Sequence, residues 1–187
     1  LVYRGYTGIE PMLLRLEAIN LKAIPYSESS QIVVVFTREM GRMSFMAKGV
    51  RKSKRSDKGK LQSFMHNRYI ISKKSGMGIV CAIDNLNPFY ELGQNLDKLK
   101  AAYLCLNLVY RVIQDHHPNE PLFDLLLHTL TELETSPEMD FSIILSEFKI
   151  HLIRIEGLLC PEETSIHEID QTLQNYLSEY SVMEGFT

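Results

Sequence analysis

The chain has 187 residues, of which 45% are apolar and 23% charged, so it can bury the core of one large domain or of two small ones. No apolar run approaches the roughly 18 residues that span a bilayer, and no basic segment followed by a long apolar stretch opens the chain, so we expect a soluble cytoplasmic protein. The net charge of −3 conceals an uneven division: residues 1–87 hold 15 of the 20 Lys and Arg but only 6 of the 23 Asp and Glu, which indicates either a nucleic-acid site or two halves that attract each other.

Residues 12–86 carry five short apolar segments that are β-branched or aromatic and separated by turn residues, a pattern typical of strands. Residues 73–76 between the last two, Lys-Lys-Ser-Gly, predict a hairpin turn. Five strands of this length favour a small Greek-key barrel of the OB type, which commonly binds single strands, and an SH3-like barrel is the alternative. The predicted strands cover 16–24, 31–37, 43–47, 64–71 and 77–83.

The connection over residues 48–60 is dense in positive charge and holds almost nothing that could pack in a core. Like charges at this density repel one another, so we interpret the segment as one that binds phosphates; the alternative is a solvated loop without a ligand. Its cations are Lys48, Arg51, Lys52, Lys54, Arg55, Lys58 and Lys60, and we expect Arg38, Arg42 and Arg68 on neighbouring strands to extend the patch.

Four aromatic residues at strand positions could stack on bases, namely Tyr26, Phe45, Phe64 and Tyr69. Half or more of them are expected in the core. Tyr26 follows a proline and precedes Ser-Glu-Ser-Ser, which makes it the best exposed candidate for base stacking.

After Pro88 the apolar spacing changes to three and four residues, which predicts a compact helical bundle over 87–187. A first helix is expected to bury one stripe, and Asn119 is expected to cap a second helix that opens with Glu-Pro. A third helix should stop at Gly157, and a fourth should follow from Ile166. The stripe of the first comprises Leu96, Leu99, Tyr103, Leu106, Tyr110 and Ile113.

We find no pattern of catalytic residues: no Gly-rich phosphate loop, no nucleophile elbow and no acidic cluster of the two-metal type in the basic half. Cys81, Cys105 and Cys160 lie far apart and form no Cys-x-x-Cys pair. We therefore expect a binding protein that is not an enzyme and has no cofactor or metal.

Several motifs, in order, resemble the RecO family of bacterial recombination and repair mediators: LEAINLK from residue 16, YSESSQI from residue 26, FTREMG from residue 36 and AKGVR from residue 47. The helical half is similar to that family around residues 89–92, 101–108, 119–126 and 148–157. The resemblance implies an OB-fold followed by helices, binding of single- and double-stranded DNA, annealing of complementary strands, and partnership with RecR and single-strand-binding protein in loading RecA. The family's basic DNA-binding positions carry over to Lys48 and Arg51.

The resemblance also implies a receptor on the helices for the acidic, apolar-ended tail of single-strand-binding protein. Such a receptor needs a cation beside an apolar pocket, and the cations of the helical half are Lys98, Lys100, Arg111, Lys149 and Arg154. Many members carry a four-cysteine zinc module where this chain has only Cys160-Pro-Glu-Glu, and residues 1–11 match nothing in the family. Two other functions stay open: an RNA-directed OB-fold processing factor, and a protein-interaction scaffold with an acidic partner.

Overall fold

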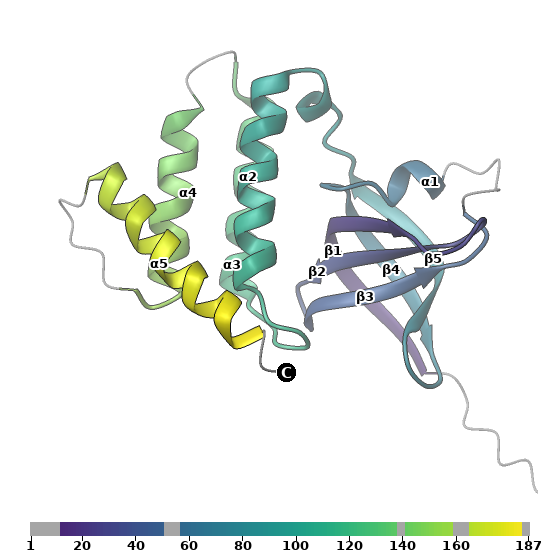
Figure 1. Ribbon diagram of the computed structural model, residues 1–187. Helices are drawn as coiled ribbons and strands as arrows, with labels where there is room; N and C mark the ends of the chain where they lie inside the picture. Colours follow the sequence, from purple (N-terminus) through teal and green to yellow (C-terminus); the bar gives the residue numbers. More distant parts are fainter. Residues whose placement is uncertain (1–11, 51–56, 138–140, 159–164, 185–187) are drawn as a thin grey trace, which may run out of the picture.

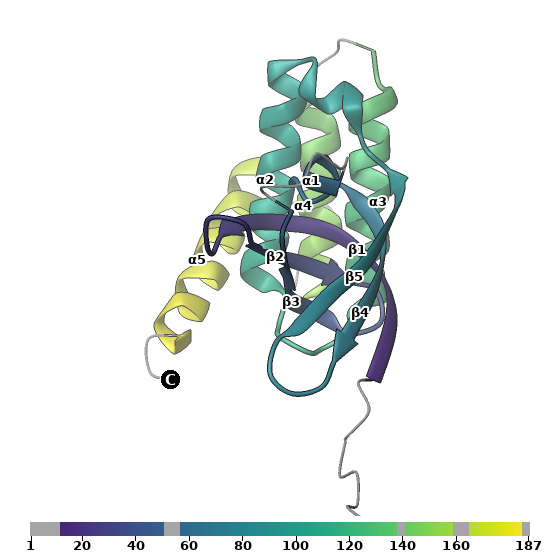
Figure 2. The same cartoon turned by 90° about the vertical axis from the view of Figure 1, so that its right-hand side faces the viewer.

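The computed structural model describes residues 12–50, 57–137, 141–158 and 165–184. In Figure 1 a β-barrel lies beside a group of helices, and the turned view of Figure 2 places the helices behind the barrel. The chain is α+β, with strands followed by helices.

The barrel is built from β1 (Met12–Pro25), β2 (Gln31–Thr37), β3 (Gly41–Ala47), β4 (His66–Lys73) and β5 (Gly78–Asn87), which close in the order β1-β2-β3-β5-β4. β1 is long enough to pair with two neighbours, β4 along its first part and β2 along its second. Its register against β2 shifts between Asn20 and Lys22, a bulge that bends the strand from one partner to the other. This confirms the predicted OB-type barrel.

A short parallel contact between β3 and β5 closes the barrel, with Phe45 opposite Gly78 and Met46 opposite Ile79. Gly78 is needed there because an added Cβ would lie 2.5 Å from the Ile71 Cγ2 atom. The hairpin turn between β4 and β5 falls at residues 74–77, one position later than predicted.

Polar residues inside the barrel fix the short helix α1 (Asp57–Lys60), which follows the basic connection. Asn20 and Asn67 are fully buried and both donate to the Lys60 carbonyl oxygen, at 2.8 and 2.7 Å. Tyr69 donates to Asn20 Oδ1 at 2.6 Å, and burial raises the pKa of this phenol. Because buried amides are costly to leave unpaired, this network holds the end of the basic connection against the barrel.

The barrel interior contains Phe45 and Tyr69 together with aliphatic residues such as Val33, Val35 and Ile71. Phe64 is also buried, at the barrel's outer side, whereas Tyr26 is 65% exposed in the β1–β2 loop. Of the four aromatic candidates, only Tyr26 is available for stacking without rearrangement, as the sequence indicated.

Four helices follow the 3₁₀ turn η1 (Tyr90–Gly93): α2 (Leu96–Val112), α3 (Glu120–Thr135), α4 (Ser142–Ile155) and α5 (Ile166–Glu184). Asn119 caps α3, since its side chain accepts a hydrogen bond from the Leu122 backbone N–H at 3.1 Å. Gly157 follows α4 with a φ of 72°, as expected of a residue that ends a helix.

The predicted buried stripe of α2 is wrong for three of its six members, whereas Leu106 and Ile113 are buried as predicted. Leu96, Tyr103 and Tyr110 are exposed by 66%, 44% and 36%, and the helix instead buries Ala101, Ala102, Cys105, Leu106, Val109 and Val112. Both faces of α2 are apolar, so spacing alone did not distinguish them; the alanines allow the closer approach to neighbouring helices. The helix also ends at Val112, before His116 and His117, and the loop that follows it contacts the barrel.

Barrel and helices share one apolar core. Ile19, Leu21, Phe36 and Phe64 of the barrel belong to the same buried cluster as the helical core. Phe36 packs edge-on against Phe123 of α3, with ring centroids 5.3 Å apart, and Phe64 packs likewise against Tyr103 of α2 at 4.5 Å. These contacts fix the barrel relative to the helices.

Candidate nucleic-acid interface

The outer face of β1, β2 and β3 is the face that OB-folds use to bind oligonucleotides, together with the β1–β2 and β4–β5 loops. Cross-strand pairing places Lys22 beside Val34 and Ser44, and Ile24 beside Ile32 and Met46. Lys22, in the first of these rows, and Tyr26 in the adjoining loop are both exposed. Sequence reasoning missed Lys22, although its position next to the buried Leu21 was the alternation signal that could have found it.

Lys48 follows β3 at this face and is exposed. Arg51, Lys52, Lys54 and Arg55 lie outside the described residues, and for Lys58 only the backbone in α1 is described. The phosphate-binding role of these residues therefore stays a prediction.

Lys60 is turned inward. Its Nζ donates to the Ile83 carbonyl oxygen on β5 at 3.1 Å, and its own carbonyl accepts from the two buried asparagines. Lys60 thus anchors α1 to the barrel in this structure.

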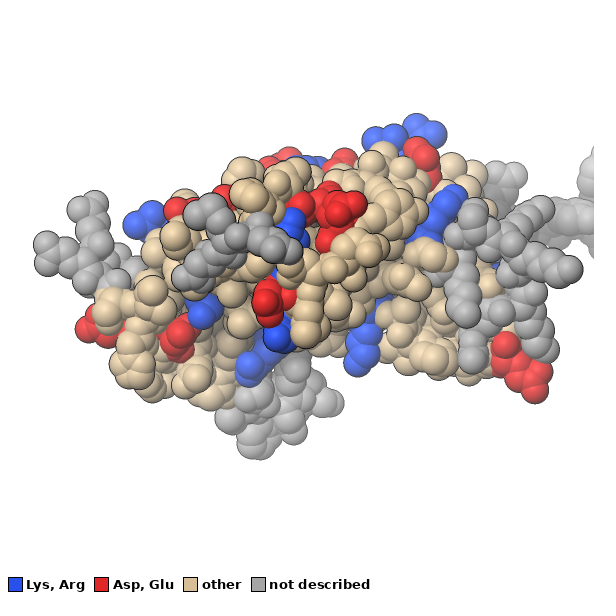
Figure 3. All heavy atoms as spheres, turned by 90° about the horizontal axis from the view of Figure 1, so that it is seen from above, with Lys and Arg blue, Asp and Glu red and all other residues tan. Residues whose placement is uncertain are grey.

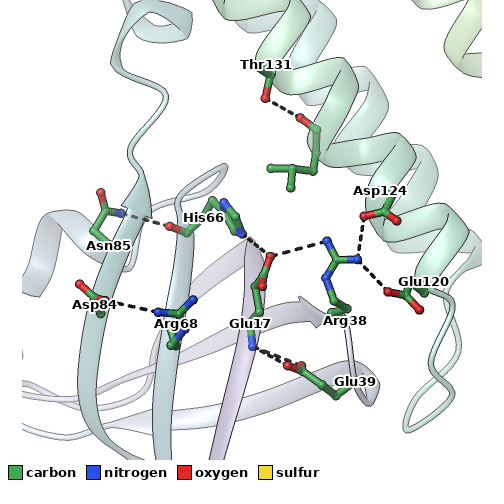
Figure 4. Close-up of polar contacts among 11 residues, drawn as sticks. Glu17, Arg38, Glu39, His66, Arg68, Asp84, Asn85, Glu120, Asp124 and Thr131 are labelled. Carbon is green, nitrogen blue, oxygen red and sulfur yellow. Dashed lines mark hydrogen bonds and ion pairs between the residues drawn. The ribbon is translucent and has the colours of Figure 1, made fainter.

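Arg38 lies in the contact between barrel and helices, as Figure 4 shows. Its guanidinium is 2.7 Å from Asp124 Oδ1 and 3.1 Å from Glu120 Oε1, both on α3, and 3.6 Å from Glu17 Oε1 on β1. It also lies over the Phe123 ring, 4.5 Å from the centroid. Burial opposes its charge, but the hydrogen bonds to Asp124 and Glu120 outweigh burial and raise the pKa of Arg38.

Glu17 joins Arg38 to a buried histidine. His66 Nε2 lies 2.9 Å from Glu17 Oε1, and its ring packs edge-on near Phe123. Burial lowers the pKa of His66 and outweighs the opposite effect of the hydrogen bond to Glu17. Carboxylates of both structural parts therefore surround Arg38, with a histidine disposed to stay neutral beside them.

Arg42 is held in a second interdomain contact. Its Nε lies 2.5 Å from Asp115 Oδ1 in the α2–α3 loop, its Nη1 donates to the Tyr110 carbonyl at 3.1 Å, and its guanidinium stacks over the Tyr110 ring. Gly41 allows this approach: its φ is 68°, and an added Cβ would collide with the His117 backbone.

Acidic residues of the helical half engage two members of the expected patch, Arg38 and Arg42. The phosphate-binding role of these arginines stays a prediction. Arg68 is exposed on β4 and lies 3.9 Å from Asp84 Oδ2. Figure 3, viewed from above, shows basic and acidic side chains interspersed over that face.

The five cations of the helical half also separate by environment. Lys98 donates to the Glu134 carbonyl at 2.8 Å, and Lys149 is paired with Asp170 at 2.6 Å. Arg154 is exposed on α4. Lys100 and Arg111 line a groove of about 520 Å³ along α2; Lys100 is also paired with Asp97 at 3.0 Å, and Arg111 donates to the Leu177 carbonyl at 3.3 Å.

This groove has the composition expected of a receptor for an apolar chain end. Its walls are the exposed apolar side of α2, including Leu96, Leu104 and Leu108, and no Asp or Glu is among the described residues that line it. Of the five candidates, the structure brings only Lys100 and Arg111 to this apolar groove.

Among the described residues, no group of three or more His, Cys, Asp or Glu could hold a metal ion. Cys160 lies outside them. No helix in the described part of the chain is both long and apolar enough to cross a membrane.

Comparison with known proteins gives matches to two consecutive family models: "Recombination protein O N terminal" over residues 12–89 and "Recombination protein O C terminal" over residues 93–158. Curated proteins named DNA repair protein RecO are similar: that of a Cyanothece species is 33% identical over 141 residues, covering 75% of this chain and 48% of the relative. That of Alkaliphilus metalliredigens is 30% identical over 164 residues, covering 88% and 66%. The chain thus spans about half to two thirds of the length of these relatives.

Proposed function

Since this chain belongs to the RecO family, we propose that it acts in DNA repair and recombination by binding single- and double-stranded DNA and annealing complementary strands. The observation that carries the proposal is the cationic sequence of residues 48–60, which connects β3 of an OB-type barrel, through exposed Lys48, to α1. Lys22 and Tyr26 on the same outer side of the barrel support it. Arg38 and Arg42 are not needed for it.

Annealing follows from charge and requires no covalent step. Two phosphate backbones repel each other, and a cationic segment that lies between them without reading bases lowers the barrier to pairing. Bases left free by such contacts can pair with the complementary strand. Stacking on Tyr26 can hold a strand in place, since it is not selective for one base.

The partners proposed for this activity are RecR and single-strand-binding protein, through which the chain helps to load RecA. The groove along α2 is the proposed receptor for the acidic, apolar-ended tail of single-strand-binding protein, because Lys100 and Arg111 supply positive charge beside apolar walls.

The decisive experiment replaces Arg51, Lys52, Lys54 and Arg55 with Ala and measures annealing of fluorescent complementary strands over a range of salt. If about five cations contact phosphates, the wild-type affinity for a single strand falls with a slope of roughly −3.5 in log salt, about a hundredfold for a fourfold increase. The variant with all four substitutions is expected to lose annealing and most of the salt dependence of its affinity.

The matched control is Arg154→Ala, which removes an exposed cation of the helical half, outside the segment. Circular dichroism checks that both variants fold. Annealing by the variant with all four substitutions at the wild-type rate would contradict the proposal.

A further inference from the structure

A second cavity, of about 560 Å³, lies where the barrel meets the helices. Its volume falls in the range of small-molecule sites, roughly 300–1,000 Å³. One wall comes from the barrel and the segment after α1, and the other from η1 and α2. The residues that matter for its chemistry are Lys22, Gln62, Phe64, Tyr90, Gln94 and Tyr103.

Two residues that line the cavity have an unusual backbone conformation. Of the three non-glycine residues with positive φ in the described chain, two line this cavity: Phe64 at 71° and Phe89 at 47°. Phe64 N–H donates to the Asn20 carbonyl at 2.9 Å, and Phe89 N–H donates to Asn87 Oδ1 at 3.0 Å. Such conformations persist where the surroundings impose them and occur often at ligand sites.

The lining suits a flat, uncharged ring. Tyr90 is 70% exposed, and Tyr103 stands edge-on to Phe64, so aromatic faces border the cavity from both sides. The side-chain amides of Gln62 and Gln94 are exposed and have no hydrogen-bond partner among the described residues. Each amide offers a donor and an acceptor, the two groups that the edge of any nucleobase requires.

The charge of the lining suits an anionic ligand, and its aromatic rings and side-chain amides favour a nucleotide over an acidic peptide. The described lining holds no Asp or Glu, and its one cation, Lys22, lies on the proposed DNA-binding side of the barrel. The cavity also adjoins the cationic segment, because Gln62 and Ser63 follow α1 after Leu61, which is fully buried in the barrel.

We propose that this cavity binds one unpaired nucleobase of a single strand, with Tyr90 as the stacking residue and Lys22 at the adjoining phosphate. The inference rests on the proposed DNA binding and adds to it a preference for unpaired bases. A base within a duplex is already stacked and cannot enter, so the cavity distinguishes a single strand from a duplex.

The test compares three probes by fluorescence anisotropy with the full chain: a thymidine 12-mer, a 12-mer whose central residues are abasic, and a 12-base-pair duplex. Tyr90→Ala is expected to weaken binding of the thymidine 12-mer about tenfold and to change the other two by less than about twofold. Tyr90→Phe, which keeps the ring, is expected to bind as the wild type does.

Ile166→Ala is the matched control, since it truncates an exposed residue that lines neither the α2 groove nor this cavity. Equal losses by Tyr90→Ala on all three probes, or no loss on the thymidine 12-mer, would overturn the inference. The inference would also be overturned if Tyr90→Ala lost binding to an acidic peptide but kept its affinity for all three DNA probes. A wild-type chain that binds none of the probes would instead refute the proposed function, on which the inference depends.

Discussion

At the scale of single residues, Arg38 and Arg42 show that carboxylates of the acidic helical half can pair with arginines of the basic half. Both were expected to meet phosphate, and both are engaged by carboxylates of the helical half. The pairs join segments more than 65 residues apart in sequence. No local pattern could have revealed them.

Arg38 is accordingly expected to matter for stability more than for DNA. Arg38→Gln leaves Asp124, Glu120 and Glu17 without their common partner and loses the contact with Phe123, so we expect the free energy of unfolding to fall by about 1–3 kcal/mol. Urea denaturation measures this change. Arg68→Gln is the control, because its ion pair is exposed and loose; DNA affinity that collapsed in folded Arg38→Gln would contradict the assignment.

His66 predicts a pH dependence of stability. Burial lowers its pKa below the ordinary value of 6.5, so the unfolded chain binds a proton more readily than the folded one. The stability that this difference in proton binding contributes is fully present above pH 6.5 and is lost as the pH falls toward the lowered pKa of His66. Thermal unfolding at pH 7.5 and 5.5 is expected to show a smaller difference for His66→Gln than for the wild type. His151→Gln, at an exposed position on α4, should retain the wild-type difference.

At the scale of elements, α2 has two apolar faces, one buried in the bundle and one exposed. Its alanine-rich side packs in the bundle, while Leu96, Tyr103 and Leu104 remain on the surface. Exposed apolar residues in a row beside cations are typical of an interaction site.

The proposed receptor on α2 can be tested with a labelled peptide of the acidic, apolar-ended tail of single-strand-binding protein. Leu104→Ser and Lys100→Gln are each expected to weaken peptide binding by about tenfold, since one removes apolar contact and the other a charge-assisted bond. Ile166→Ser and Arg154→Gln are matched controls at exposed positions outside the groove. A peptide affinity that depended on Arg154 and not on Lys100 would place the receptor on α4.

At the scale of the whole molecule, the opposite charges of the two halves serve two purposes. Part of the charge is neutralised internally, at the contacts of Arg38 and Arg42 with the helices. Segment 48–60 concentrates seven of the cations between β3 and the end of α1, where the network of Asn20, Asn67 and Tyr69 holds its C-terminal end. Because barrel and helices share one core, a strand on the barrel and a peptide on α2 would bind to one rigid frame.

The sequence by itself determined the barrel, the helical half, the Asn119 cap and the exposure of Tyr26, because strand alternation, turn residues and capping are local properties. Only the tertiary structure decided which face of α2 is buried and which arginines remain available. It also formed the cavity between barrel and helices, since Phe64 and Tyr90 come together only when the barrel packs against the helices. These outcomes depend on contacts between distant segments, and such contacts are set by packing and charge pairing in three dimensions.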